Sequence, residues 1–200
     1  ALHRAMAPYG GFDHNAQALR VVTQLENRYA EHDGLNLTWE TLEGILKHNG
    51  PMVDSAGQPV GRYIAEGLPA GVNEISAIAD LRLSSHASLE AQVAAISDDI
   101  AYNAHDIDDA LRAGLVKLTD FEDAPMAGPI VLEVESLYPD VGPKRQTHEV
   151  QRRMITRAIE DVIRQSAINF ESAGVQSAEE VRMAGKTLVT FSEETAAAER

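Results

Sequence analysis

Cysteine is absent from this 200-residue sequence, aromatic residues make up only 5% of it, and long apolar runs are missing. Without cysteine the chain cannot form a disulfide, a thiolate metal site or a cysteine nucleophile, and this composition is typical of a cytoplasmic protein. No apolar stretch approaches 18 residues, so no transmembrane helix is predicted. The first residues show no basic region followed by an apolar run, so we expect no signal peptide.

Positive charge is also scarce, because 17 Lys and Arg stand against 31 Asp and Glu and give a net charge of −14. Such an acidic chain is a poor candidate for binding nucleic acid or an anionic membrane. The 44% hydrophobic content is enough for one core, so we expect residues 1–200 to form a single domain. The chain opens on Ala1 in "ALHRAM", which resembles the end of a helix, and we expect it to be a fragment of a longer polypeptide.

Strand-like alternation is rare and helix-forming residues dominate, so the predicted fold class is all-α with multiple helices. The residues between 51 and 72 hold three Pro and four Gly and are expected to form a loop outside the core. Capping residues and apolar periodicity predict helices over 13–31, from Thr38 to a stop at Asn49, over 73–83, over 88–111, from Pro129 onward, over 147–171 and from the cap Ser177 to a stop at Gly185.

Acidic residues line one side of the helix predicted in "SLEAQVAAISDDIAYNAHDIDDAL". Asp98, Tyr102 and Asp106 are spaced four apart, so they stack along one line, away from the apolar face. A solvated helix face explains this pattern directly. Alanines on the same side and a shortage of basic i,i+4 partners favour instead a half-buried line of carboxylates that a cation must neutralise. The two interpretations stay open on the residues alone.

Four blocks of the sequence together carry a family resemblance. They are "GGFDHNAQALRVVTQLENRY", "GLNLTWETLEGILKHNGP", "LEAQVAAISDDIAYNAHDIDDALRAG" and "THEVQRRMI" followed by "EDVI". In this order they resemble the bacterial HD-domain deoxynucleoside triphosphate triphosphohydrolases, especially the dGTPase-like branch. The resemblance implies part of an all-α HD-domain fold. It also implies a homo-oligomeric enzyme that cleaves deoxynucleoside triphosphates to deoxynucleoside and inorganic triphosphate.

The resemblance also implies roles for residues on the acidic helix. Asp98 matches a ligand of a divalent metal, Mg²⁺ or Mn²⁺, and Tyr102 and Asp106 match positions that contact the substrate sugar. Asp99 is the rival metal ligand, but the spacing to Tyr102 favours Asp98. The dipeptide His105-Asp106 is treated as an accidental match to the HD motif.

The remaining metal ligands of the family, a histidine and a His-Asp pair, precede the first block and are missing from this chain. Asp13-His14 has the reversed order and does not replace them. Because a catalytic metal site needs about three protein ligands, we expect the chain by itself to be catalytically incomplete.

Further substrate contacts are expected at residues that match family positions. His14 matches a residue near the scissile phosphate, where an imidazole can donate a proton to the leaving oxygen. A role at the helix terminus is the alternative for His14. Asn15 and Gln17 are expected to contact substrate, although Gln17 also fits a surface position.

Positively charged side chains are the expected triphosphate ligands. Lys47 ends a helix, where the macrodipole alone explains a cation. Arg152 and Arg153 belong to the densest positive cluster of the chain, and guanidinium forks suit phosphate oxygens, but an ordinary helix surface that balances nearby acids explains them equally well. Trp39 is expected in the core.

The sequence thus predicts metal-dependent hydrolysis of a dGTP-like nucleotide in the intact protein. The alternatives are an HD phosphohydrolase acting on other nucleotides and a non-catalytic module for nucleotide binding or oligomerisation.

Overall fold

The computed structural model describes residues 2–9 and 11–198. Within this part the chain forms helices and loops without a strand, and the pairs Asn27–Gly34 and Val53–Pro59 form isolated bridges. The all-α prediction is confirmed. No described helix combines the length and apolar character needed to cross a membrane.

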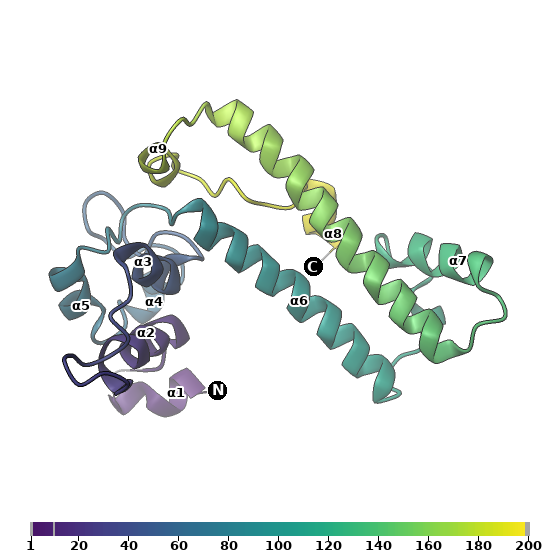
Figure 1. The fold of residues 1–200 in the computed structure, drawn as a ribbon, viewed down its shortest axis with the longest axis horizontal. Helices are drawn as coiled ribbons and strands as arrows, with labels where there is room; N and C mark the ends of the chain where they lie inside the picture. The colour runs from purple at the N-terminus through teal and green to yellow at the C-terminus, as the bar shows by residue number, and fades with distance from the viewer. Residues whose placement is uncertain (1, 10, 199–200) are drawn as a thin grey trace. The chain divides into compact units, whose positions relative to one another are not determined.

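The fold divides into two compact units (Figure 1). Unit 1 comprises Ala1–Ala95 and Val175–Leu188, and unit 2 comprises Ile96–Gly174 and Val189–Arg200. Each unit is described by itself, and a single domain over residues 1–200 stays a prediction. The helices of unit 1 are α1 (Leu2–Met6), α2 (His14–Arg20), α3 (Trp39–Lys47), α4 (Tyr63–Glu66), α5 (Val72–Ala79), the start of α6 (Leu89–Arg112) and α9 (Ala178–Arg182). Those of unit 2 are the rest of α6, α7 (Ala127–Leu137), α8 (Pro143–Ala173) and α10 (Glu193–Ala198).

Unit 1 is built around the packing of α2 on α3 (Figure 1). Its core consists of Leu19, Leu46, Met52, Tyr63, Val72, Ile75 and Leu81. Trp39, which was expected in the core, is half-buried and packs against this cluster. Three of the core residues come from the segment 51–72, which was predicted to lie outside the core, and that prediction is wrong. Proline and glycine do predict the irregular backbone, but backbone bonds from Met52 N to Leu83 O (2.8 Å) and from Val60 N to Met52 O (3.0 Å) fold the segment inward.

The helix predicted over 13–31 is also shorter than expected. After α2 the chain forms one π-helical stretch, Val21–Leu25, and becomes extended at Glu26. The chain then turns back and brings Gly34 so close to Val22 that a β-carbon on Gly34 would lie 2.5 Å from Val22 O. The positive φ of 69° at Gly34 also suits glycine. This tight return ends the helix.

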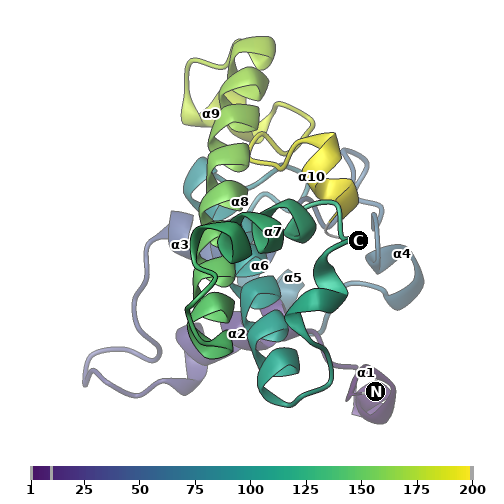
Figure 2. The same ribbon diagram turned by 90° about the vertical axis from the view of Figure 1, so that its right-hand side faces the viewer.

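Unit 2 is centred on the packing of α7 against α8, which Figure 2 shows face-on. Its core consists of Ala127, Ile130, Val131, Val134, Val150 and Met154. Helix α8 begins at Pro143, earlier than predicted, because proline is favoured at the first helical position. Helix α7 begins at Ala127, two residues before the proline that was expected to start it.

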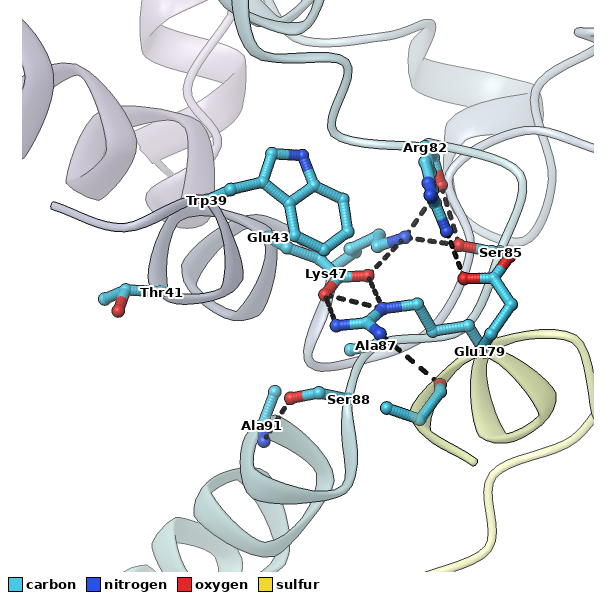
Figure 3. A network of polar contacts seen from close by, with 12 residues as sticks. Trp39, Thr41, Glu43, Lys47, Arg82, Ser85, Ala87, Ser88, Ala91 and Glu179 are labelled. Carbon is cyan, nitrogen blue, oxygen red and sulfur yellow. Dashed lines mark hydrogen bonds and ion pairs between the residues drawn. The ribbon is translucent and has the colours of Figure 1, made fainter. Parts of the chain in front are cut away.

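A buried ion network joins two parts of unit 1 that lie far apart in sequence (Figure 3). The Glu43 carboxylate on α3 accepts hydrogen bonds from Arg182 Nε (2.9 and 3.0 Å) and Nη2 (2.8 Å) on α9. It also pairs with Lys47 Nζ at 3.0 Å, and the Glu43 and Lys47 side chains are 0% exposed. The Arg182 guanidinium lies 4.9 Å from the Trp39 ring centroid. The network therefore fastens the segment 175–188 to α3.

Removing Arg182 tests how much this fastening contributes to stability. We expect Arg182→Met to lower the free energy of unfolding by about 3 kcal/mol, because a buried carboxylate loses its bidentate partner. The matched control is Arg28→Met, which breaks an exposed pair with Glu26 and should cost under about 1 kcal/mol. Urea denaturation followed by the fluorescence of the single tryptophan, Trp39, measures both. Equal effects of the two substitutions would contradict the role of the network.

Gly128 offers a second test, in unit 2. A β-carbon there would lie 2.0 Å from Glu122 O, whereas one at Gly142 meets nothing within 4 Å. Gly128→Ala is expected to destabilise by about 2 kcal/mol, because backbone must move, and Gly142→Ala by under about 1 kcal/mol. Thermal unfolding followed by circular dichroism compares the two, and an unchanged melting temperature for Gly128→Ala would show that the close approach is absent.

Candidate active site

The N-terminus of α2 holds His14 at the surface of unit 1. Asp13 caps the helix, because its Oδ1 accepts a hydrogen bond from Ala16 N (2.9 Å). The same carboxylate pairs with Arg62 Nη2 at 2.6 Å, which neutralises the charge next to His14. The His14 side chain is exposed. Its imidazole is therefore free to meet a ligand, and its role in proton donation stays a prediction.

Asn15 and Gln17 differ in exposure. Asn15 is buried, and its Nδ2 donates to Leu46 O on α3 at 3.2 Å. This bond fixes α2 against the end of α3, so Asn15 positions its neighbour His14. Gln17 is half-buried. Substrate contacts by Asn15 and Gln17 stay predictions.

The C-terminal end of α3 presents His48 next to His14. The two ring centroids are 6.5 Å apart, and the ring planes are tilted by 36°. The Nδ1 atom of His48 lies 3.0 Å from Gly44 O, which fixes the ring. Two imidazoles from separate helices thus meet on one side of unit 1.

Lys47, one residue earlier, points into the protein. Its Nζ donates to Arg82 O and to Ser85 Oγ, both at 2.7 Å, besides pairing with Glu43. Burial lowers the pKa of Lys47 below its ordinary value, and the charges of Arg182 and Arg82 act in the same direction, whereas Glu43 opposes them. The hydrogen bond to Glu43 raises the pKa of Arg182. A contact between Lys47 and triphosphate would require its ammonium to leave this network.

The acidic line lies on α6 in unit 2. Asp98, Tyr102 and Asp106 are all exposed, Tyr102 to 65%. The buried acid of this helix is Asp108, whose Oδ2 pairs with Arg112 Nε at 2.7 Å. Of the two interpretations left open by the sequence, the exposure of the line agrees with a solvated helix face and not with a half-buried one. Binding of a cation or of substrate along the line stays a prediction.

No group of three or more His, Cys, Asp or Glu side chains within the described residues is arranged to hold a metal. Asp98 supplies one carboxylate, and a divalent cation at a catalytic site needs about three protein ligands. The residues present therefore do not by themselves fit a metal site.

Arg152 and Arg153 pair with carboxylates on the surface of unit 2. Arg152 Nη2 lies 2.6 Å from Glu149 Oε1, and Arg153 lies 2.9 Å from Glu149 Oε1 and 2.5 Å from Glu133 Oε1. Hydrogen bonds from Arg152 and Arg153 lower the pKa of Glu149. This pairing favours the interpretation of the cluster as a helix surface that balances nearby acids. Binding of triphosphate by these arginines stays a prediction.

Unit 2 also contains a cavity of about 460 Å³ between α7, α8 and α10. Arg157, Asp161 and Arg164 are among its lining residues, but none of the residues predicted for the site lines it. Arg164 pairs with Asp161 at 2.6 Å and Arg157 with Glu133 at 2.5 Å, so both arginines of the lining already have carboxylate partners.

The predicted site residues fall into both units. His14, Asn15, Gln17 and Lys47 belong to unit 1, and Asp98, Tyr102, Asp106, Arg152 and Arg153 belong to unit 2. Sequence reasoning did not predict Glu43 and Arg182 as a buried pair. The i,i+4 spacing of Glu43 and Lys47 indicates an ion pair within α3 and could have been recognised in the sequence. No local pattern indicates the pairing with Arg182, because Arg182 is 139 residues away from Glu43.

Comparison with known proteins gives the same family as the sequence blocks. No family model matches the chain. Curated proteins named deoxyguanosinetriphosphate triphosphohydrolase-like protein do match: the chain is 56% identical to one from Azorhizobium caulinodans over 96% of its length and 50% identical to one from Allorhizobium ampelinum over 100%. A similarly named protein 1 of Mesorhizobium japonicum is 52% identical over 100% of the chain.

The chain spans about half the length of these relatives, 48% of each. An identity of 50–56% over 96–100% of the chain is far too high for a chance match. Over the half of their length that it spans, the chain is closely similar to the deoxyguanosinetriphosphate triphosphohydrolase-like proteins, the family that the sequence blocks resemble.

Proposed function

We propose that the polypeptide carrying this chain hydrolyses deoxynucleoside triphosphates to deoxynucleoside and inorganic triphosphate. The observation that supports this proposal is the 50–56% identity, over 96–100% of the chain, to proteins named deoxyguanosinetriphosphate triphosphohydrolase-like protein. The exposure of His14, Asp98, Tyr102 and Asp106 is consistent with it, because a residue that meets substrate must be accessible.

Each exposed residue has a defined chemical role in the proposed reaction. His14 donates a proton to the 5′-oxygen as it leaves phosphorus, which removes the cost of expelling an alkoxide. Tyr102 and Asp106 hydrogen-bond the sugar and discriminate against a 2′-hydroxyl. Asp98 contributes one ligand to a divalent cation, and the other ligands belong to the part of the relatives' length that this chain does not match.

The positive side chains are proposed to hold the triphosphate by exchanging partners. Lys47 can leave Glu43 without stranding a buried charge, because Glu43 keeps three hydrogen bonds from Arg182. Arg152 and Arg153 are more accessible, and phosphate oxygens can replace Glu149 as acceptors of their guanidinium forks.

Asp98→Ala in the full-length polypeptide tests the reaction and the ligand together. With Mn²⁺ or Mg²⁺ and each dNTP supplied in turn and in mixtures, the unsubstituted protein should release deoxynucleoside and intact triphosphate. Asp98→Ala is expected to lower turnover at least about 100-fold, because loss of a metal ligand costs no less than loss of the groups that orient it. Chromatography of the products measures both.

The neighbouring acid provides the matched control. Asp99 is also exposed, and Asp99→Ala should change turnover less than about threefold. A large loss of turnover in Asp99→Ala and a small one in Asp98→Ala would instead identify Asp99 as the metal ligand. Absence of turnover with every dNTP would replace the proposed hydrolase by a non-catalytic nucleotide-binding module.

The sugar contacts are tested by Tyr102→Phe, which removes only the hydroxyl. We expect kcat/KM for the preferred dNTP to fall about tenfold, the value of one lost hydrogen bond, and its ratio to kcat/KM for the matching ribonucleotide to fall as well. His105→Asn, an exposed position on the same helix, serves as control. An unchanged dNTP-to-NTP ratio for Tyr102→Phe would contradict the sugar contact.

A further inference from the structure

The pair of imidazoles on unit 1 has a geometry that ring packing does not explain. Its centroids are 6.5 Å apart with planes tilted by 36°. Aromatic pairs interact over about 4.5–7 Å, so this separation lies near the far limit, where little attraction remains. The His48 ring is nevertheless placed by its bond to Gly44 O, and the bonds of Asp13 and Asn15 hold the start of α2, which carries His14.

The contact with Gly44 determines which atom of His48 can meet a ligand. A carbonyl oxygen only accepts hydrogen bonds, so Nδ1 of His48, at 3.0 Å from Gly44 O, must carry a proton. Its second ring nitrogen, Nε2, has no such partner assigned to it within the described residues. Nε2 is therefore the atom that can contact a ligand.

The spacing of the rings suits one shared oxygen atom. If each ring forms a hydrogen bond of roughly 2.8 Å to the same oxygen and the two bonds diverge tetrahedrally, the centroids come to lie about 6–7 Å apart. The observed 6.5 Å falls in this range. Two rings packed for their own sake would come closer.

We propose that His48 contacts the triphosphate of the substrate, with its Nε2 and the His14 imidazole directed at the same phosphate group. This inference rests on the proposed function and adds to it a residue that the sequence blocks did not assign. An anion is acceptable here because Asp13, the residue before His14, and Glu43, on the helix that precedes His48, are both compensated. Asp13 pairs with Arg62, and Glu43 pairs with Arg182 and Lys47.

Two substitutions separate contact with phosphate from a structural role for His48. An asparagine amide can take the place of Nδ1, so His48→Asn keeps the bond to Gly44 and loses the outward nitrogen. A glutamine amide reaches the place of Nε2, so His48→Gln keeps the outward contact and loses the bond to Gly44. A structural role predicts that Asn is tolerated and Gln is not, and the phosphate contact predicts the reverse.

The probe is inorganic triphosphate, titrated into the full-length polypeptide by calorimetry, with dNTP turnover measured in parallel. We expect His48→Asn to weaken triphosphate binding about tenfold or more, as loss of a hydrogen bond to a charged group does, and His48→Gln to weaken it less than threefold. His32→Asn is the control, because His32 packs on Tyr29 in another loop of unit 1. His14→Asn should weaken binding as His48→Asn does.

The outcomes for this inference and for the proposed function are distinguishable. Normal binding by His48→Asn, or a greater loss in His48→Gln, overturns the inference while turnover by the unsubstituted protein leaves the function standing. If the unsubstituted protein turns over no dNTP, the function fails, and the binding comparison still decides whether His48 contacts triphosphate. Absence of triphosphate binding to the unsubstituted protein overturns the inference as well.

Discussion

Unit 1 depends on one buried carboxylate. Glu43 accepts three hydrogen bonds from Arg182 and one ion pair from Lys47, and thereby ties the segment 175–188 to α3. Burial lowers the pKa of Lys47 by desolvating its ammonium, and the charge of Arg182, the second cation on this anion, lowers it further. Removing Glu43 would leave the charges of Lys47 and Arg182 without their common partner in a dry interior.

In each unit a buried polar side chain on a long helix binds the backbone of the C-terminal segment. In unit 1, Leu188 N donates to Gln92 Oε1 at 2.8 Å. In unit 2, Ser192 N donates to Asp161 Oδ2 at 2.8 Å. Burial alone would raise the pKa of Asp161, but hydrogen bonds from Ser192 and Arg164 lower it below its usual range. In unit 1 the bond from Asn15 Nδ2 to Leu46 O (3.2 Å) holds α2 against α3, so the residues at their ends, His14 and His48, occupy defined positions.

The sequence predicted those helices that are specified by neighbouring residues, through apolar periodicity or a capping residue. The long α6 follows from apolar periodicity, and the cap Ser177, whose Oγ accepts from Glu180 N at 3.2 Å, follows from capping chemistry. Thr38 precedes α3 as predicted, but its side chain forms no hydrogen bond to the backbone of the first turn. The core role of Met52 and the pairing of Glu43 with Arg182 depend on contacts between distant segments, which composition cannot reveal. For the site, family resemblance named His14, whereas the partnership of His14 with His48 needed the packing of two helices.

The most direct measurement is a crystal structure of the full-length polypeptide with a non-hydrolysable dNTP analogue and Mg²⁺. The account predicts His14 and His48 Nε2 within hydrogen-bonding distance of the triphosphate, Tyr102 and Asp106 on the sugar, and Asp98 on the metal. An analogue bound away from these residues, or His48 turned from the phosphates with its ring still on Gly44, would contradict it.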